Sequence, residues 1–355
     1  MQQAKIHPQG DKIRIVFFAD THLGFDYPLR PKVARRRRGG DFYDNYKAVL
    51  GHAIDTRADL VIHGGDFFFR SRVPKKIIDL AYGPLFEFAA HGIPFLIVPG
   101  NHERSELPTS LYLAHPNIYV FNRPRTYTFD IAGAKIGIAG FPFERGDIRS
   151  RFGSVLAQTG WDREQSDVNL LCIHQAVEGA QVGPSNYTFR HGEDVVKIDD
   201  PPAEFMAVLA GHIHRKQIFT RRAGRNRGEV TVIYPGSTER TSFAEKMEEK
   251  GFFEITLTRI DGSQWRMGKL DFKTLPARPM VDLLLDASVS RSNLRFYIAS
   301  RVGGFEKDAI VRIRSKGKLD DGIRSTLTTE FLRGIFPDTM NFQFSSGFFQ
   351  RRSGR

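Results

Sequence analysis

Seven residues with side chains that bind metal ions stand directly after five short apolar segments. These segments end, in chain order, in Asp-x-His, Gly-Gly-Asp, Gly-Asn-His-Glu, a single His and Gly-His-x-His. Carboxylate, amide and imidazole donors together suit first-row divalent ions such as manganese, iron or zinc better than an all-oxygen calcium or magnesium site. The candidate ligands are Asp20, His22, Asp66, Asn101, His174, His212 and His214.

This number of donors indicates two metal ions. Seven donors exceed the four positions of a tetrahedral site, but they suit two ions that share one carboxylate and take water in the remaining positions. Two ions about 3.5–4 Å apart can hold a bridging hydroxide and position a phosphate for in-line displacement. We therefore predict a two-metal site that hydrolyses phosphoester bonds through a bridging hydroxide.

Each motif alone is weak, because histidines and Gly-Asp pairs are common in cores and turns. Five motifs in this order, each at the end of a predicted strand, are far more specific. The other histidines are interpreted as surface or packed core residues, and they are His7, His52, His63, His91, His115 and His191.

The elements that must position these residues follow from the apolar pattern. Runs of four to eight β-branched and aromatic residues predict buried strands, here at 13–19, 59–63, 93–98, 135–139, 168–173, 206–210 and 230–234. Helices are predicted over 42–54, with Asp41 as N-cap, and from Pro74 to about 90. Strands separated by helices indicate an α/β layered core, in which polar residues past the carboxyl strand ends form the ligand site.

The pattern changes at a proline-containing linker around 273–279. Beyond it we expect a small α+β unit that begins with the segments 280–285 and 293–298, followed by a strand at 309–313, a helix over about 321–333 and a last strand at 340–344. We therefore predict a catalytic domain over 1–272 and, over 273–355, a linker with a small binding or capping domain that lacks the ligand motifs.

Composition narrows the function further. Among 355 residues, 52 Lys and Arg against 40 Asp and Glu give a net charge of +12, which favours a polyanionic partner. The single cysteine, Cys172, excludes an intramolecular disulfide and a cysteine-based zinc finger. No apolar run approaches the roughly 20 residues that span a bilayer, and no signal sequence is evident. We expect a cytoplasmic protein that does not bind membranes.

The five motifs resemble those of the calcineurin-like metallophosphoesterase superfamily, whose fold is a two-sheet sandwich flanked by helices. The resemblance implies that one ion is held by Asp20, His22, Asp66 and His214. It implies that the second ion is held by Asp66, Asn101, His174 and His212, so that Asp66 bridges. It also implies a catalytic role for His102, which would stabilise developing charge on the phosphate or protonate the leaving oxygen.

Two local features separate members of this superfamily. Phosphoprotein phosphatases carry Gly-Asp-x-x-Asp-Arg-Gly, in which the second Asp orients the histidine, whereas this chain has Phe69 at that position. The segments 70–74, 234–252 and 275–279 resemble those of SbcD-type DNA double-strand-break repair nucleases. That resemblance implies manganese-dependent exonuclease activity on DNA ends, endonuclease activity on single strands, a homodimer and a coiled-coil ATPase partner. The last residues offer no helical pair to dock the ATPase, so this partner stays open.

Basic residues are expected to form a DNA track, because contacts to phosphate give affinity that does not depend on base sequence. One group follows the first metal-binding strand in a loop expected to open on the metal side, and another follows His214. The predicted DNA-binding residues are Arg35, Arg36, Arg37, Arg38, Arg70, Arg215, Lys216, Arg221 and Arg222. Three consecutive phenylalanines, Phe67 to Phe69, could stack on bases, but packing is the favoured interpretation.

Together these observations predict a two-metal-dependent DNA nuclease of DNA repair, using manganese, with iron, zinc or magnesium as alternatives. A phosphoesterase of small diesters such as cyclic nucleotides, and a DNA-end-binding scaffold without cleavage, are the alternative functions.

Overall fold

The computed structural model describes residues 10–27, 35–108, 111, 115–163, 165–222, 229–262, 264–286 and 288–345. The chain forms two compact units. Unit 1 comprises Met1–Phe25, Gly39–Thr241 and Met247–Pro276, and unit 2 comprises Asp26–Arg38, Ser242–Lys246 and Ala277–Arg355. The predicted domain division between 272 and 273 stays a proposal. The units differ from it because 26–38 and 242–246 belong to unit 2.

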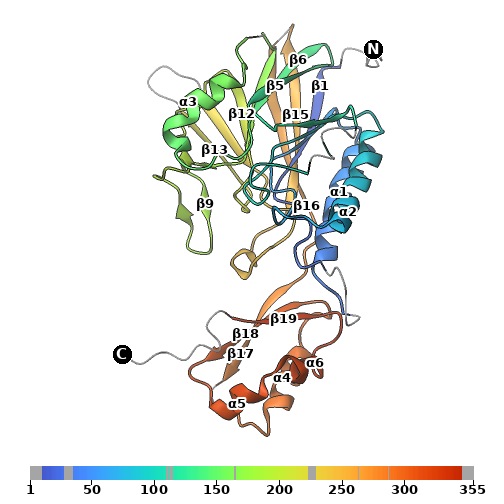
Figure 1. Ribbon diagram of the computed structural model, residues 1–355, viewed down its shortest axis with the longest axis vertical. Helices are drawn as coiled ribbons and strands as arrows, with labels where there is room; N and C mark the ends of the chain where they lie inside the picture. Colours follow the sequence, from blue (N-terminus) through green and yellow to red (C-terminus); the bar gives the residue numbers. More distant parts are fainter. Residues whose placement is uncertain are drawn as a thin grey trace. The chain divides into compact units, whose positions relative to one another are not determined.

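Unit 1 contains two six-stranded sheets (Figure 1). The strands of the first sheet are β1 (Lys12–Phe18), β2 (Leu60–His63), β3 (Phe95–Ile97), β4 (Ile118–Val120), β15 (Gly251–Asp261) and β16 (Gln264–Thr274). Their order is β16-β15-β1-β2-β3-β4. Strands β1 to β4 are parallel, whereas β15 runs antiparallel to β1 and β16 antiparallel to β15.

The second sheet also has a parallel centre. Its strands are β5 (Arg125–Ile131), β6 (Ala134–Gly140), β7 (Val168–Ile173), β12 (Phe205–Ala210), β13 (Gln217–Arg222) and β14 (Glu229–Tyr234). Their order is β13-β14-β12-β7-β6-β5, with β5 and β13 as antiparallel edges. Four two-residue strands complete unit 1, namely β8 (Ala176–Val177), β9 (Gln181–Val182), β10 (Tyr187–Thr188) and β11 (Val195–Val196).

The main core lies between the two sheets. Alternate side chains of β1, such as Ile15 and Phe17, pack with residues of the second sheet such as Leu170 and Leu209. Helix α2 (Lys75–Ala89) packs on the other face of the first sheet, where Phe88 contacts Phe95 with ring centroids 6.0 Å apart. Helix α1 (Gly39–Asp55) packs against α2.

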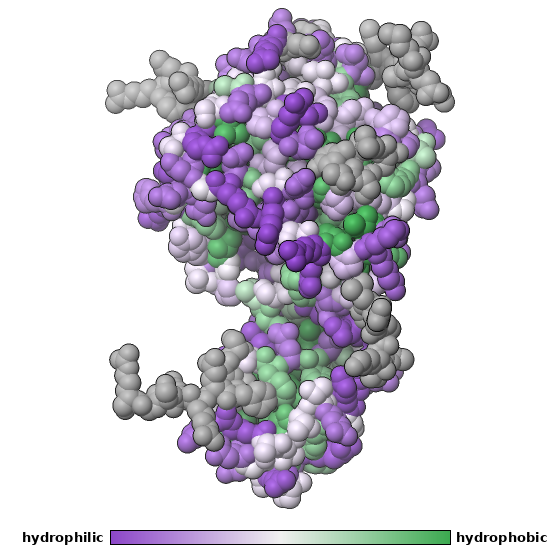
Figure 2. Space-filling view, in the orientation of Figure 1, coloured by the Kyte–Doolittle hydropathy of each residue, from purple (hydrophilic) through white to green (hydrophobic). Residues whose placement is uncertain are grey.

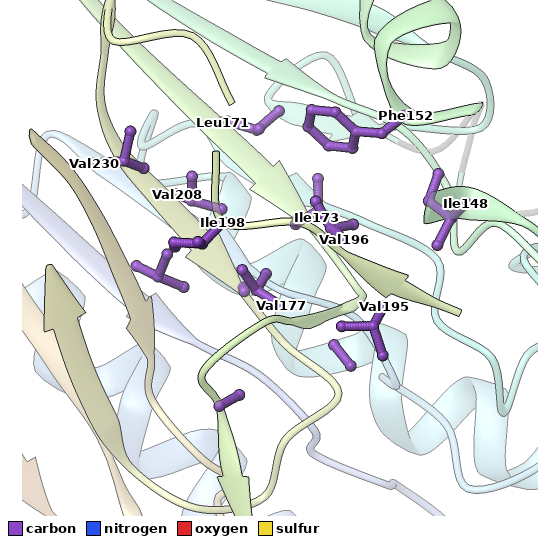
Figure 3. Packing of buried hydrophobic residues seen from close by; sticks show 14 of the residues in the cluster. Ile148, Phe152, Leu171, Ile173, Val177, Val195, Val196, Ile198, Val208 and Val230 are labelled. Atoms are coloured by element: carbon purple, nitrogen blue, oxygen red, sulfur yellow. The ribbon is translucent and has the colours of Figure 1, made fainter. Parts of the chain in front are cut away.

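The outer face of the second sheet carries its own apolar cluster (Figure 3). Helix α3 (Ile148–Gln158) contributes Phe152 to it, and β7 contributes Leu171 and Ile173. On the face of unit 1 shown in Figure 2, hydrophilic residues predominate at the surface. The predicted two-sheet α/β sandwich with flanking helices is confirmed.

Unit 2 is built on a three-stranded parallel sheet of β17 (Met280–Asp286), β18 (Ile310–Lys316) and β19 (Asn341–Phe344). Helix α4 (Leu294–Val302), helix α5 (Asp321–Thr326) and helix α6 (Thr329–Arg333) pack on one face of it. A short 3-10 turn at Phe243–Glu245 also belongs to this unit.

The single helix predicted over 321–333 is wrong in one respect, because the structure divides it into α5 and α6. The division occurs because Thr328 is extended, with a ψ of 160°, and its side-chain oxygen accepts a hydrogen bond from the Phe331 amide. A threonine cap therefore starts a new helix. Among the described residues, no helix combines the length and the apolar character needed to cross a membrane.

Candidate metal centre

The predicted ligands follow the carboxyl ends of neighbouring parallel strands in unit 1. Asp20 and His22 follow β1, Asp66 follows β2, His174 follows β7 and His212 follows β12. Strands β1 and β2 are neighbours in the first sheet, and β7 and β12 are neighbours in the second. The two sheets therefore deliver their polar strand ends to one place.

Four of these ligands adopt a left-handed backbone conformation. The φ angles are 53° at Asp20, 44° at His22, 52° at Asp66 and 87° at His212. Such angles are uncommon for residues with a Cβ atom and cost about 1–3 kcal/mol each. Backbone hydrogen bonds from Asp20 to Gly65 and from His22 to Asp66, of 2.9 and 3.0 Å, hold the turns. The strained turns aim the side chains and the backbone into the centre.

Two glycines of the motifs are needed for close approach. A Cβ atom at Gly65, where φ is 106°, would lie 2.2 Å from Nδ1 of His174. A Cβ atom at Gly100 would lie 2.2 Å from Oδ1 of Asp66. No side chain fits at these distances, so the loops can approach the ligands only with glycine at both positions.

One group of donors gathers around His22. Its Nε2 atom lies 2.9 Å from Nε2 of His214 and 4.0 Å from Oδ2 of Asp66. The Nε2 atom of His214 lies 3.9 Å from Oδ1 of Asp20. Two nitrogen ligands at right angles on one ion, with bonds of about 2.1 Å, would be about 3 Å apart. The spacing of the two imidazoles therefore fits a shared metal ion.

A second group gathers around Asn101. Its Oδ1 atom lies 3.0 Å from Nε2 of His174 and 2.9 Å from Nδ1 of His212. Nε2 of His174 lies 3.4 Å from Oδ2 of Asp66, so the same carboxylate oxygen faces both groups. Nδ1 of His174 donates to the Gly64 carbonyl at 2.8 Å, which leaves Nε2 as the atom that can bind a metal. The structure thus brings all seven predicted ligands together.

Burial gives the centre unusual protonation equilibria. Burial raises the pKa of Asp20 to about 6, although His174 partly offsets this effect. Burial also acts on Asp66, but the attraction of His174, His22 and His102 outweighs it and holds the pKa of this carboxylate well below its usual range. Burial, reinforced by His174, lowers the pKa of His212 to about 3, so its imidazole is neutral, as a metal ligand must be.

His102 lies beside the centre with an accessible ring. Its amide N–H donates to Oδ1 of Asp66 at 2.9 Å, and Nδ1 donates to the Phe69 carbonyl at 2.8 Å. Nε2 therefore faces the centre, 3.8 Å from Oδ2 of Asp66, and the side chain is 34% exposed. A group bound in the centre could reach this nitrogen.

Comparison with known proteins identifies the family. The model of the calcineurin-like phosphoesterase family matches residues 13–216, more than half of the chain and all seven ligands. The chain belongs to the calcineurin-like phosphoesterase family. The predicted superfamily is therefore confirmed, and membership supports the predicted enzyme class, a metal-dependent hydrolase of phosphoesters.

Relatives narrow the resemblance to a group of DNA repair proteins. The chain is 24% identical over 256 residues to the DNA double-strand break repair protein Mre11 of Methanococcus maripaludis, covering 68% of this chain and 62% of that protein. It is 26% identical over 264 residues to Mre11 of Methanocaldococcus jannaschii, covering 73% of this chain and 66% of that protein. It is 23% identical over 313 residues to Mre11 of Thermoplasma acidophilum, covering 85% of this chain and 76% of that protein. The chain thus spans less than two thirds of the first two relatives. The predicted resemblance to repair nucleases is confirmed at this level.

The glutamate of the Gly-Asn-His-Glu motif supports the phosphoesterase centre, although no pattern in the sequence indicates this role. Glu103, which follows His102, is 3% exposed. Its two carboxylate oxygens accept hydrogen bonds from the Phe68 and Gly100 amides, at 2.6 and 2.8 Å. It thereby ties the loop after β2 to the loop after β3. Burial, together with the charge of Asp66, raises the pKa of Glu103 to about 8.

His63, interpreted from the sequence as a surface or packed core residue, lies in the core and also supports the loops of the centre. The Gly65 amide donates to Nδ1 of His63 at 3.2 Å, so Nε2 carries the hydrogen and donates to Thr21 Oγ1 at 3.1 Å. The Thr21 hydroxyl in turn donates to the Phe67 carbonyl at 3.0 Å. This relay connects the Asp-x-His turn with the Gly-Gly-Asp turn.

The three phenylalanines divide between two environments. Phe67 and Phe68 are fully buried and contact Tyr82. Phe69 is half-buried, and its ring lies 5.5 Å from that of His102 and 6.0 Å from that of His22. The packing interpretation therefore describes the first two residues, whereas the third borders the centre.

The arginines of the first predicted DNA group lie in unit 2. Ion pairs join Arg35 to Asp338 at 3.1 Å, and Arg36 to Asp308 at 3.6 Å. Arg37 pairs with Asp26, and Arg38 is buried. These guanidinium groups have acidic partners or are covered within unit 2, so their predicted role in DNA binding stays a prediction.

The second predicted group also makes contacts within the protein. Arg215 donates to Glu248, Asn186 and the Gly183 carbonyl, at 3.0, 2.7 and 2.8 Å. Lys216 pairs with Glu249 at 2.6 Å. Arg221 and Arg222 lie on β13, and their side chains are outside the described part of the structure.

Arg70 differs from these residues, because it is exposed and adjoins the centre. Its guanidinium group lies 5.6 Å from the centroid of the Phe69 ring.

Proposed function

We propose that this chain is a two-metal-dependent nuclease of DNA repair, which acts as an exonuclease on DNA ends and an endonuclease on single strands. The observation that carries the proposal is the convergence of seven donors and His102 in a calcineurin-like phosphoesterase. The choice of DNA is supported by the Mre11-named relatives and by the net charge of +12. Because the chain spans less than two thirds of the length of the first two relatives, sequence identity alone does not transfer their activity to it, and the activity is proposed.

The donor set fits two divalent ions. Asp20, His22, Asp66 and His214 would hold one ion, and Asp66, Asn101, His174 and His212 would hold the other. Two bound ions would activate water at neutral pH and stabilise negative charge on the phosphoryl oxygens. Mixed nitrogen and oxygen donors with two carboxylates suit manganese, with iron, zinc and magnesium as alternatives.

The residues of the chain supply orientation and leaving-group assistance. Oδ1 of Asp66 accepts a hydrogen bond from the His102 amide, which leaves Oδ2 directed at both groups of metal donors. During hydrolysis, water forms the new bond to phosphorus and the bond to the 3′ or 5′ oxygen breaks. In its doubly protonated form, His102 keeps the Nδ1 hydrogen bond to the Phe69 carbonyl and would donate the proton on Nε2, which faces the centre, to that oxygen as it departs.

Arg70 is the proposed DNA contact closest to this chemistry. It is exposed, follows directly after Phe69 and can reach a phosphate beside the centre. An Arg70→Ala variant should bind single-stranded DNA several-fold more weakly and reduce the slope of log affinity against log salt by about 1. An unchanged salt slope, measured by fluorescence anisotropy, would remove Arg70 from the proposed track.

The resemblance to repair nucleases also leads us to propose a homodimer, a coiled-coil ATPase partner and a cytoplasmic location. The capping domain over 273–355 is proposed to contribute to DNA binding. None of these proposals changes the chemistry proposed for the metal centre.

The direct test compares substrates in one assay. End-labelled duplex DNA, end-labelled single-stranded DNA, bis-p-nitrophenyl phosphate and a cyclic nucleotide are incubated with the protein and manganese at low salt, with and without chelator. The proposal expects chelator-sensitive cleavage of both DNA forms, with labelled products that also report polarity. Cleavage of the small esters alone would favour the small-diester function, and tight DNA binding without any cleavage would favour the scaffold function.

A further inference from the structure

The orientation of His102 depends on a neighbour that has no acidic side chain. Nδ1 of His102 donates to the Phe69 carbonyl at 2.8 Å. A carbonyl oxygen only accepts, so Nδ1 carries the hydrogen and Nε2 is presented to the centre. The hydrogen bond from the His102 amide to Asp66, of 2.9 Å, fixes the backbone of the same residue. The ring is thus held at its backbone and at one nitrogen.

The backbone that leads to the Phe69 carbonyl is held by the pairing of two loops. The Phe69 amide donates to the Leu23 carbonyl at 3.1 Å, and the Leu23 amide donates to the Phe67 carbonyl at 2.9 Å. These two hydrogen bonds hold the backbone of Phe69 on its amide side, next to the carbonyl that accepts from His102.

The ring of Phe69 adds a second contact to the imidazole. The ring centroids of Phe69 and His102 are 5.5 Å apart, with planes inclined at 37°. On another side, the Phe69 ring packs edge-to-face on Phe25, with centroids 4.8 Å apart. Such aromatic pairs contribute about 0.5–1.5 kcal/mol beyond the area they bury. The ring therefore restricts the rotation of the His102 side chain.

We propose that Phe69 is a positioning residue for His102, acting through its carbonyl on Nδ1 and through its ring on the imidazole. The proposal rests on the proposed function, in which His102 assists departure of the leaving oxygen. Phe69 occupies the position at which phosphoprotein phosphatases of this superfamily carry an orienting aspartate. In this chain, a neutral backbone carbonyl and an aromatic face take over orientation without adding a negative charge beside the metal centre.

The test varies the leaving group. Two aryl esters of thymidine 5′-phosphate are compared, one with phenol and one with p-nitrophenol as leaving group. Phenolate needs assistance to depart, whereas p-nitrophenolate departs readily. For Phe69→Leu we expect kcat to fall about tenfold on the phenyl ester and less than about twofold on the p-nitrophenyl ester. Phe69→Met, which fills a similar volume without an aromatic face, should give the same selectivity and guards against loss of folding.

Phe143 provides a matched control. Its ring also borders the centre, but it contacts His174 and His212, with centroids 6.1 and 5.7 Å away. A Phe143→Leu variant acts on the ligand groups, so any loss should be equal on the two esters. An equal loss on both esters for Phe69→Leu as well would overturn the proposal, because it would indicate a general effect on the centre.

A double-mutant cycle with His102→Gln separates positioning from packing. If Phe69 acts through His102, Phe69→Leu should cause less than about a twofold further loss on the phenyl ester once His102 is replaced. Additive losses would overturn the proposal. Failure of the wild-type protein to cleave labelled DNA would be a different result, since it would overturn the proposed function, whatever the selectivity of Phe69→Leu between the two esters.

Discussion

The two units use parallel strands in opposite ways. In unit 1 the carboxyl ends of the central strands carry buried polar ligands, and Asp20, His22 and His174 have no exposed surface. In unit 2 the buried cluster under the helices is apolar among the described residues. Its acidic Asp282 is paired outside that cluster with Arg312 and Lys246. Unit 1 therefore gathers strained and buried polar side chains at one site, whereas the cluster under the helices of unit 2 contributes to stability.

The largest expected effect comes from exchanging one aspartate in each unit. Asp66→Asn removes a charge from the carboxylate that faces both donor groups, so DNA cleavage should fall roughly 10³-fold. Asp282→Asn changes an ion pair in unit 2 and should alter cleavage less than about threefold. Rates are measured on labelled single-stranded DNA with manganese. Comparable losses in the two variants would break the distinction between the units.

A core truncation in unit 2 should have the converse effect. Ile313 has no exposed surface and lies in the apolar cluster of this unit. Ile313→Ala should destabilise unit 2 by about 2–5 kcal/mol. Hydrogen exchange read by mass spectrometry should accelerate in 277–345, while hydrolysis of bis-p-nitrophenyl phosphate by unit 1 is retained. Loss of this hydrolysis in a folded variant would show that the chemistry depends on the core of unit 2.

Metal binding should stabilise only one of the units. An ion that binds the folded site alone, at 100 times its dissociation constant, contributes about 2.7 kcal/mol. Manganese should therefore slow hydrogen exchange in the strands that lead to the ligands, β1, β2, β7 and β12, and leave β17 to β19 unchanged. Equal slowing in both units would argue for ions bound outside the proposed centre.

In the metal-free protein, the stabilities of the two units should change with pH in opposite directions. Burial raises the pKa of Glu103 from 4.5 to about 8, so its contribution to stability is present below about 4.5 and is lost as pH rises through 8. For Asp282, hydrogen bonds from Arg312 and Lys246 outweigh partial burial and lower the pKa from 3.8 to about 2. Its contribution is present above about 3.8 and is lost as pH falls through 2.

Glu103→Gln and Asp282→Asn isolate these two contributions. Glu103→Gln should flatten the pH dependence of hydrogen exchange in unit 1 between about pH 4.5 and 8, and Asp282→Asn should flatten that of unit 2 between about pH 2 and 4. These effects are the smallest of the set. An unchanged pH profile in either variant would remove that group from the comparison.

The meeting of the candidate ligands could be predicted from the sequence because strand ends are local features. Asp20, Asp66 and His174 each follow a recognisable apolar run, and the geometry of parallel sheets then requires that they meet. The roles of Glu103 and Phe69 depend on contacts between loops that are distant in sequence, including backbone groups. A carbonyl that orients a histidine leaves no mark on residue type, so no sequence pattern indicates it.

In the fold as well, the sequence could not predict features that depend on contacts between residues far apart in the chain. The segments 26–38 and 242–246 follow ligand motifs of unit 1, yet they belong to unit 2. Arg35 finds its acidic partner, Asp338, about 300 residues later. Charge patterning along the chain could place these arginines on a loop but could not show which acidic groups would neutralise them. The break between α5 and α6 depends on the Thr328 cap, which competes with continuation of the helix.

The most direct test of the account is a manganese titration in which bound ions and DNA cleavage are measured in the same samples. After chelator treatment, the protein should bind two manganese ions per chain, and cleavage of labelled DNA should rise with occupancy of the centre and be absent in the metal-free protein. Full cleavage by the chelated protein, or saturation with two ions and no cleavage of DNA, would contradict the account.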